Sequence, residues 1–439
     1  MKKDNRYKLI SILLIFAANL AYAQDTLSLQ QAIELSLANG YGIRIAKNNQ
    51  RIAENNYSLG NAGILPRIDA YATQNYSIDD SRQEYLGERG VQERSGARSE
   101  SFSSSVELKW TLFDGMRMFI AYDRLAELNK MGEANLQMQV EKTVNDVAIA
   151  YHQIVLEQER LKVINNILDL SSERMEIAKT KFEVGKASKM EYLAAQVDYN
   201  EDTSSYVLQL ERLNDAKIDL NVIMGLDRNT NYHVQSSIHF VDTLQREDLY
   251  QSMMTNNSAR KLQALDYAVA QLEAREIKAE RMPVISFNTS YNYNKSAAET
   301  GLVLSRRTNG LGVGFTASMN IFNGFNLNRR IQNARIDIEN SELAMRELDL
   351  ALKAQFDKSY NNYRNSIIVY NLEQSNLNVA RENAEIALER YKLGVANAIE
   401  LREAQLNLAQ AENRLLDAAY SVKINEISLM QLSGMLARN

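Results

Sequence analysis

Two periods of hydrophobic residues alternate along the chain. In segments 117–184 and 326–393, apolar side chains recur at alternating spacings of three and four, for example at Val147, Tyr151 and Ile154. A repeat near 3.5 residues is typical of helices that pack as coiled coils. Each segment holds 68 residues, so each predicts a helix roughly 100 Å long at ~1.5 Å per residue.

Four other segments alternate between apolar and polar residues, which predicts strands with one apolar face. They run at about 67–78, 102–113, 284–294 and 311–322. Strands of about 10–12 residues can cross a bilayer with tilt, whereas strands of soluble sheets run nearer five or six. The pattern favours membrane strands. Three aromatic residues on these strands suit a membrane interface: Trp110, Tyr291 and Tyr293. Trp110 also fits a core position.

Shorter helices and a polar loop complete the pattern. Ser28 can cap a helix that continues to about Ile64, and Pro66 then forces extended geometry. The matching helix of the second half runs at about 247–281, before Pro283. A polar segment rich in Gly, Ser, Arg and Glu separates the first two strands and is expected to form a loop.

The second half of the chain repeats the first. Segment Ile177–Gln196 matches Ile386–Gln405, and the turn that begins at Phe113 matches the one at Phe322. From Phe113 onward the offset is a constant 209 residues, which makes chance similarity implausible. We therefore expect a first structural repeat, an equatorial linker and a second repeat, at residues 24–226, 227–246 and 247–439.

The first 23 residues predict a cleaved signal peptide. A basic start from Lys2 to Lys8 precedes an apolar run, and Ala21-Tyr22-Ala23 is typical of a cleavage site. The alternative, a membrane anchor helix, requires a longer apolar run. We expect the mature chain to begin near Gln24 and to cross the inner membrane.

Composition excludes several classes of function. Residues 1–23 carry four basic and one acidic side chain, so their removal changes the formal net charge from −5 to −8. That balance argues against a nucleic-acid partner. The chain has no cysteine, and its three histidines lack metal-ligand spacing, so neither a disulfide framework nor a metal site is expected. Since no catalytic motif or nucleotide-binding loop is recognisable, we expect neither enzymatic activity nor a cofactor.

Four membrane strands cannot close a barrel, for which about eight are the usual minimum. Open strand edges are not tolerated in lipid, so the chain must share its strands with copies of itself. Two copies would give an eight-stranded barrel, whose interior would be filled by its own side chains. Three copies give twelve, and the sequence therefore favours a homotrimer.

In the order and spacing of these features, the mature chain resembles the TolC family. The features are the signal peptide, the two-fold repeat, the prolines before the strands, the Phe-Asp-Gly and Phe-Asn-Gly turns, and the Lys-Leu-Gly-Val run at Lys392–Val395. The resemblance implies a mainly α-helical fold with membrane β-strands. Three copies would share a twelve-stranded barrel, and long coiled-coil helices would form a periplasmic tunnel.

The resemblance also implies a function. The protein would be a passive outer-membrane exit duct of a tripartite efflux or type I secretion system, surrounded by outer-membrane lipid and extending into the periplasm. Its partners would be a periplasmic membrane-fusion adaptor and an inner-membrane transporter of RND or ABC type. A secreted periplasmic coiled-coil structural or adhesion protein is the alternative, but it leaves the four strands unexplained. A periplasmic hydrolase lacks any recognisable catalytic motif.

By the same resemblance, two helical hairpins form the inner end of the tunnel. This tip closes the pore and docks the adaptor, and five residues around its two turns match: Gly185, Lys186, Tyr391, Gly394 and Val395. Both glycines also fit ordinary helix carboxyl caps in left-handed geometry.

The arginine of the family's closed tip has no direct counterpart here. Related channels hold the tip closed with an arginine two residues past the second glycine, and in this chain that position is Ala396. Three nearby cations are candidates to replace it: Arg402, Lys186 and Lys189.

Acidic residues just beyond the turns are the candidate pore constriction. Glu400 and Glu403 stand six and nine residues after Gly394, and Glu191 stands six after Gly185. In a trimer each would form a ring of three carboxylates able to attract cations. The alternative is a solvated helix face, which is the usual position of such charges.

Overall fold

The computed structural model describes residues 26–87, 90–227, 230, 232–235 and 237–436. The predicted signal peptide lies outside these residues. The chain divides into two compact units. Unit 1 comprises the residues up to Asn48, Ala134–Lys261 and those from Glu347 onward, and unit 2 comprises Asn49–Glu133 and Leu262–Arg346. Because each unit draws on both halves of the chain, the division into sequence repeats and a linker stays a prediction.

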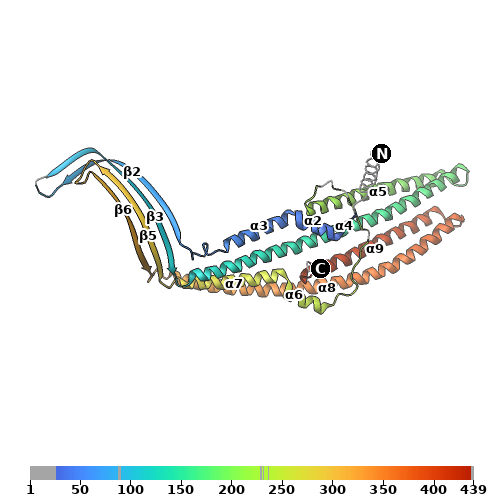
Figure 1. The fold of residues 1–439 in the computed structure, drawn as a ribbon. Coiled ribbons are helices and arrows are strands. Elements are labelled where there is room, and N and C mark those ends of the chain that lie inside the picture. The colour runs from blue at the N-terminus through green and yellow to red at the C-terminus, as the bar shows by residue number, and fades with distance from the viewer. Residues whose placement is uncertain (1–25, 88–89, 228–229, 231, 236, 437–439) are drawn as a thin grey trace, which may run out of the picture. The chain divides into compact units, whose positions relative to one another are not determined.

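Unit 2 contains a four-stranded antiparallel sheet with the order β2-β3-β5-β6 (Figure 1). The strands are β2 (Arg67–Glu84), β3 (Val91–Phe113), β5 (Val284–Ala298) and β6 (Ser305–Ser318). Pro66 and Pro283 directly precede β2 and β5, as expected for a residue that cannot donate to a strand ladder. Each of the four predicted strands is present.

The first two strands extend well past their predicted outer ends. Most of the predicted polar loop at 79–101 is a ladder that continues to Glu84 opposite Val91. That prediction was wrong because both faces of this ribbon are largely exposed, so its side chains need no apolar alternation. Backbone pairing and polar contacts hold it instead, such as the 3.1 Å ion pair between Arg82 and Glu93.

One face of the sheet is apolar. Directly opposite residues form three rows across β3, β5 and β6: Trp110–Phe287–Phe315, Leu108–Thr289–Val313 and Val106–Tyr291–Leu311. Leu311 and Phe315 are 70% and 71% exposed, so no layer of the described chain covers them. The opposite face carries polar residues and glycine, such as Glu107, Asn288 and Gly312. This one-sided pattern fits strands that face lipid on one side only.

The two segments predicted as single shorter helices are each broken. Helices α2 (Leu29–Asn39) and α3 (Tyr41–Asn56) meet at Gly40, and α6 (Arg246–Asn256) and α7 (Ser258–Ala279) meet at Asn257. At Gly40 the backbone is extended (ψ 125°). A Cβ there would lie 2.5 Å from the carbonyl oxygen of Ser36. A close backbone approach of this kind leaves no trace in the hydrophobic pattern.

Four longer helices form two hairpins. Helix α4 (Arg117–Glu183) turns into α5 (Lys189–Met224), and α8 (Asn326–Lys392) turns into α9 (Ala398–Leu432) (Figure 1). Both long helices end within one residue of their predicted ends. None of the helices in the described part of the chain combines the length and the apolarity needed to cross a membrane.

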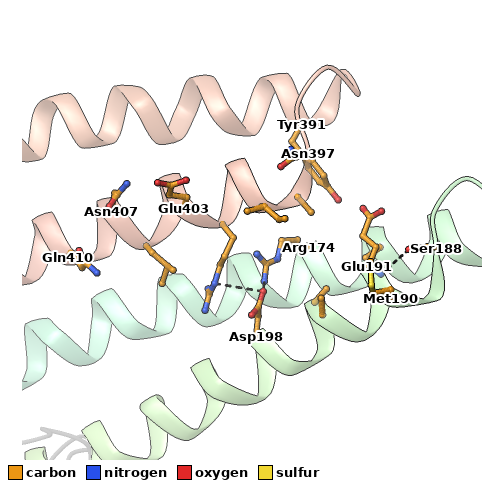
Figure 2. Close-up of a pocket in the computed structure, with 17 residues that line it drawn as sticks. Arg174, Ser188, Met190, Glu191, Asp198, Tyr391, Asn397, Glu403, Asn407 and Gln410 are labelled. Atoms are coloured by element: carbon orange, nitrogen blue, oxygen red, sulfur yellow. Dashed lines mark hydrogen bonds and ion pairs between the residues drawn. The ribbon is translucent and has the colours of Figure 1, made fainter.

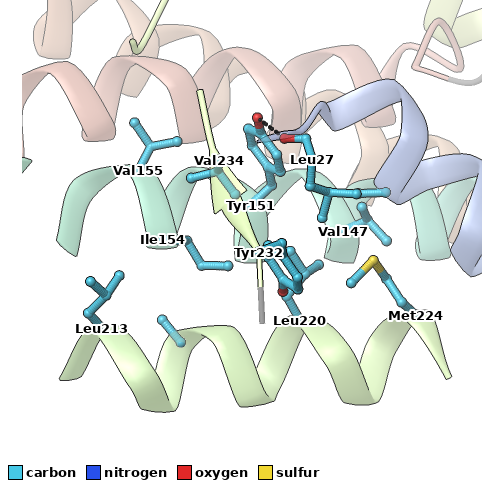
Figure 3. Close-up of a cluster of buried hydrophobic side chains, with 12 residues drawn as sticks. Leu27, Val147, Tyr151, Ile154, Val155, Leu213, Leu220, Met224, Tyr232 and Val234 are labelled. Carbon is cyan, nitrogen blue, oxygen red and sulfur yellow. Dashed lines mark hydrogen bonds between the residues drawn. The ribbon is translucent and has the colours of Figure 1, made fainter. Parts of the chain in front are cut away.

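An apolar core in unit 1 ties the start of the described chain to the α4–α5 hairpin (Figure 3). Strand β1 (Thr26–Leu27) pairs in parallel with β4 (His233–Val234). The Tyr151 hydroxyl donates to the carbonyl of Leu27 at 3.0 Å, and Val147 and Ile154 are fully buried beside it. The coiled-coil positions identified from the 3.5-residue repeat are therefore core residues.

His152, next to Tyr151 on α4, is a buried base. Its side chain is 5% exposed, and neither ring nitrogen has a hydrogen-bond partner among the described residues. Burial, reinforced by the positive charge of Lys423, lowers the pKa of His152 from 6.5 to about 4. The folded chain thus holds this imidazole in its neutral form.

We expect unit 1 to lose stability as the pH falls from about 6.5 towards 4. In this range the unfolded chain binds a proton at His152 and the folded chain does not, so the stabilisation is complete above pH 6.5 and is lost below it. Between these limits the loss reaches about 3 kcal/mol, since each tenfold change in proton concentration costs about 1.4 kcal/mol. Thermal unfolding at pH 7.5 and pH 4.5 measures the drop in midpoint.

The variant His152→Leu should show a smaller acid-induced drop than the parent. His239→Gln is the matched control, because His239 is exposed and its removal should leave the drop unchanged. A drop in His152→Leu equal to that of the parent would contradict the assignment.

Candidate functional site: the tips of the helical hairpins

Each hairpin turns at a glycine in left-handed geometry. Gly185 has φ +73° and Gly394 has φ +76°, a backbone region that other residues rarely adopt. The N–H of Lys186 donates to the carbonyl of Lys181 at 2.7 Å, and the equivalent bond past Gly394 measures 3.0 Å. These bonds span five residues and are the Schellman ending of a helix. Both glycines are therefore helix caps, a role that is compatible with adaptor docking at the same turns.

Side-chain caps start the returning helices. Ser188 Oγ accepts the N–H of Glu191 at 3.2 Å, and Asn397 Oδ1 accepts the N–H of Glu400 at 2.8 Å. Glu191 and Glu400 thus occupy the first turn of a helix, where its dipole stabilises a carboxylate. Glu400 Oε1 also lies 2.6 Å from a guanidinium nitrogen of Arg390 in the same hairpin. Much of the charge of Glu400 is therefore balanced locally.

A groove of about 770 Å³ lies between the two tips (Figure 2). Residues of both hairpins line it, among them Glu191 of α5, Tyr391 of α8 and Glu403 of α9. Glu400 does not line this groove. Of the three carboxylates predicted from the sequence, the structure therefore brings two together.

Tyr391 is a packing residue between the hairpins. Its side chain is 3% exposed and belongs to an apolar cluster with Leu401 of α9 and Ile177 of α4. The Nζ atom of Lys181 lies 4.1 Å from the ring centroid, within the range of a cation–π contact. Tyr391 thus joins the two tips by contacts with both α4 and α9.

Arg402 joins the hairpins by a buried ion pair. Its guanidinium, on α9, donates two parallel hydrogen bonds to the carboxylate of Asp202 on α5, at 2.8 Å and 3.0 Å. The two side chains are only 12% and 9% exposed. Burial alone would lower the pKa of Arg402, but the hydrogen bond and the charge of Asp202 raise it. Arg402 thus keeps its charge, and the bidentate geometry fixes the relative orientation of the two helices.

Further residues complete this network within the α4–α5 hairpin. Asp198 forms an ion pair with Arg174 and lies 3.9 Å from Arg402, and Ser171 donates to Asp202. Figure 2 shows Arg174 and Asp198 between the helices. The sequence identified Arg402 as a candidate but not its partners. Asp198 and Asp202 are one helical turn apart, which places two carboxylates on the same side of the helix and indicates a cation partner. Only the packed structure shows that this partner is Arg402.

The remaining residues predicted from the sequence are spread over both units. Lys186 and Val395 are exposed at the turns. In unit 2, the Trp110 indole N–H donates to the carbonyl of Ile64 at 2.9 Å, and Tyr291 is 52% exposed. Within the described ranges, no group of three or more His, Asp or Glu residues is placed to hold a metal ion.

Comparison with known proteins assigns the family. The sequence profile described as outer membrane efflux protein matches residues 32–226 and 249–435. The chain belongs to this family. Its relatives include protein CyaE of Bordetella pertussis, 23% identical over 430 residues (94% of this chain, 85% of the relative). Another is outer membrane protein TolC of Escherichia coli, 19% identical over 387 residues (85% of this chain, 75% of the relative).

Solved structures of outer-membrane channels share the fold. The CmeC channel of Campylobacter jejuni aligns with a TM-score of 0.74 at 14% identity, over 93% of this chain and 85% of that chain. The outer membrane protein VceC of Vibrio cholerae aligns with a TM-score of 0.73 at 13% identity, over 92% and 96%. The predicted fold class, a mainly helical duct with membrane strands, is thereby confirmed.

Family membership decides between the functions that the sequence left open. The chain is an outer-membrane exit duct of the kind used in efflux or type I secretion, and it extends into the periplasm. Outer membrane efflux proteins are channels, and they are homotrimers that work with adaptors and inner-membrane pumps. The alternative of a secreted adhesion protein is set aside.

Proposed function

We propose that this duct is passive, non-catalytic and gated at its hairpin tips, with Arg402 as the closing residue. In this proposal three copies share a twelve-stranded barrel that is surrounded by outer-membrane lipid. The hairpin tips dock a periplasmic adaptor, and a pump of RND or ABC type supplies the energy. The observation that carries the proposal is the bidentate bond from Arg402 to Asp202, which joins one hairpin to the other.

A buried ion pair suits a contact that must break and re-form. Desolvation of the two charges offsets much of their attraction, so the pair contributes little net stability while the hairpins stay together. Separation of the hairpins returns both groups to water and recovers that desolvation cost. An apolar seam of the same size would instead expose hydrophobic surface when it opened. Arg402 thus takes the role of the arginine that the family places at the position of Ala396.

Exposed apolar side chains at the turns support adaptor docking there. Leu393, Val395 and Ile399 are 77%, 66% and 78% exposed at the second tip, and Val184 and Met190 are 61% and 78% exposed at the first. Such clustering of uncovered apolar groups is typical of a protein–protein contact. We therefore assign Gly185, Lys186, Gly394 and Val395 to the docking surface, and Tyr391 to its buried support.

We also propose that Glu191, Glu400 and Glu403 form carboxylate rings at the constriction of the trimer. Glu191 and Glu403 support this through their shared groove. Glu400 contributes less, because Arg390 already neutralises it within the hairpin. Rings of carboxylates raise the local concentration of cations and repel anions.

Removal of the closing charge should open the channel. Arg402→Gln leaves Asp202 buried without its partner, which costs about 3–5 kcal/mol and should raise the open-to-closed ratio by about 100-fold or more. Single-channel recordings in planar bilayers measure this ratio.

The double variant Arg402→Gln/Asp202→Asn removes both charges and should recover most of the closed state. Arg414→Gln is the matched control, because Arg414 pairs with Glu373 inside one hairpin. A resting conductance of Arg402→Gln equal to that of the parent would refute the closing role.

The carboxylate rings should set the cation preference. Glu403→Gln should shift the reversal potential in a salt gradient towards zero, and Glu400→Gln should shift it in the same direction because that change leaves the positive charge of Arg390 unbalanced. The exposed Glu382 of α8 provides the control variant Glu382→Gln. If the double variant Glu400→Gln/Glu403→Gln kept the parental reversal potential, these glutamates would belong to a solvated helix face.

A further inference from the structure

Two cations face each other on the apolar side of the sheet, at its outer end. Lys295 of β5 lies directly opposite Arg307 of β6. Both residues have the same strand parity as Tyr291, Tyr293 and Leu311, so they share the apolar face. Like charges directly opposite on a sheet repel each other and destabilise the pairing. The position therefore calls for an anion.

No carboxylate of the described chain forms an ion pair with either cation. Arg307 instead lies over the ring of Tyr293, with its guanidinium carbon 5.2 Å from the centroid. Phe102 packs edge-on against the same ring at 6.1 Å. Glu100, one row further out, forms no ion pair with Lys295 or Arg307. Arg307 therefore lies over an aromatic pair, and the side chains of both cations are exposed.

The distance along the strand places this pair at the boundary of the apolar band. Eight residues separate Phe287 of the innermost aromatic row from Lys295, or ~26 Å at ~3.3 Å per residue. A strand tilt of about 40° reduces this to ~20 Å along the membrane normal, compared with an apolar band about 25 Å tall in membrane barrels. Long basic side chains extend from such a position into the headgroup layer.

We propose that Lys295 and Arg307 bind the phosphate of an anionic outer-leaflet lipid, whose acyl chains lie on the apolar rows below. The proposal rests on the outer-membrane barrel of the proposed function. The occupant must carry a phosphate or similar anion beside hydrocarbon, because the cations directly border apolar and aromatic side chains. Tyr293 forms the transition between the two, with its ring against the acyl region and Arg307 above it.

A matched control lies next to the proposed site. Arg306 is adjacent to Arg307, but it pairs with Ser296 and so faces the opposite, polar side of the sheet. It has the same charge and the same depth without access to the lipid. Lys295 also separates lipid binding from contacts between copies. Arg307 lies on the edge strand β6, next to the position of a neighbouring copy, whereas Lys295 lies on the inner strand β5. A loss of affinity in the Lys295 variant is therefore not explained by a carboxylate of a neighbouring copy.

The test is a lipid titration of the purified, detergent-solubilised full-length protein. The probes are diphosphorylated lipid A, phosphatidylcholine and inorganic phosphate, and thermal stabilisation reports the apparent affinity. Each basic residue near an anionic surface contributes about 1 kcal/mol, which converts to about fivefold in affinity. Lys295→Gln should therefore weaken binding of lipid A about fivefold, and Lys295→Gln/Arg307→Gln about 30-fold. Arg306→Gln and the charge-preserving Lys295→Arg/Arg307→Lys should bind as the parent does.

Three results would overturn the proposal. They are an unchanged affinity in Lys295→Gln, an equal loss in Arg306→Gln, and equal stabilisation by inorganic phosphate, which would indicate a site for the free ion. Oligomeric state and conductance are recorded for each variant. Loss of lipid affinity with trimer and conductance intact supports the site alone, whereas a parent that forms no trimer contradicts the proposed barrel itself.

Discussion

The sheet of unit 2 cannot be satisfied within one chain. Its four strands end in two unpaired edges, β2 and β6, and its apolar face has no covering layer among the described residues. Water can solvate the edges but not the apolar face, and lipid can solvate the face but not the edges. The apolar face and the strand edges are both satisfied only when lipid covers the face and further strands pair with both edges. Membrane insertion and assembly of copies are thus one requirement of the same sheet.

In the proposed gating, the hairpin tips meet the opposite requirement, since they must be able to separate. The apolar cluster around Tyr391 gives the closed tips their packing, while the neutral set of two arginines and two aspartates gives them orientation. Buried charges contribute specificity at little net stability. The helices further along unit 1 contain fully buried residues such as Ile154 and Phe356. Those positions favour permanent packing, and the tips favour a reversible contact.

The sequence predicted features that local physics determines. The long helices follow from the 3.5-residue repeat, the strand starts from Pro66 and Pro283, and the tip turns from Gly185 and Gly394. It did not predict the helix breaks at Gly40 and Asn257, because close backbone packing decides them. The outer ribbon of β2 and β3 was taken for a loop, since exposure of both faces removes the alternation that identifies a strand. The sequence did not distinguish Arg402 from Lys186 and Lys189, because burial of the Arg402 side chain depends on the neighbouring hairpin.

We infer that β6 of one copy pairs with β2 of the next to close a ring of three. The chain has no cysteine, so any disulfide that forms must involve the introduced cysteines. Within one chain β2 and β6 are three strand spacings apart, ~14 Å, beyond the reach of a disulfide. Thr73→Cys should therefore be combined in turn with Gly310→Cys, Gly312→Cys and Gly314→Cys, on the same polar face, and oxidised in membranes. We expect at least one pair to yield a covalent trimer on a denaturing gel that reducing agent converts to monomer. Monomer alone for every pair, or a ladder that continues beyond three, would contradict the claim.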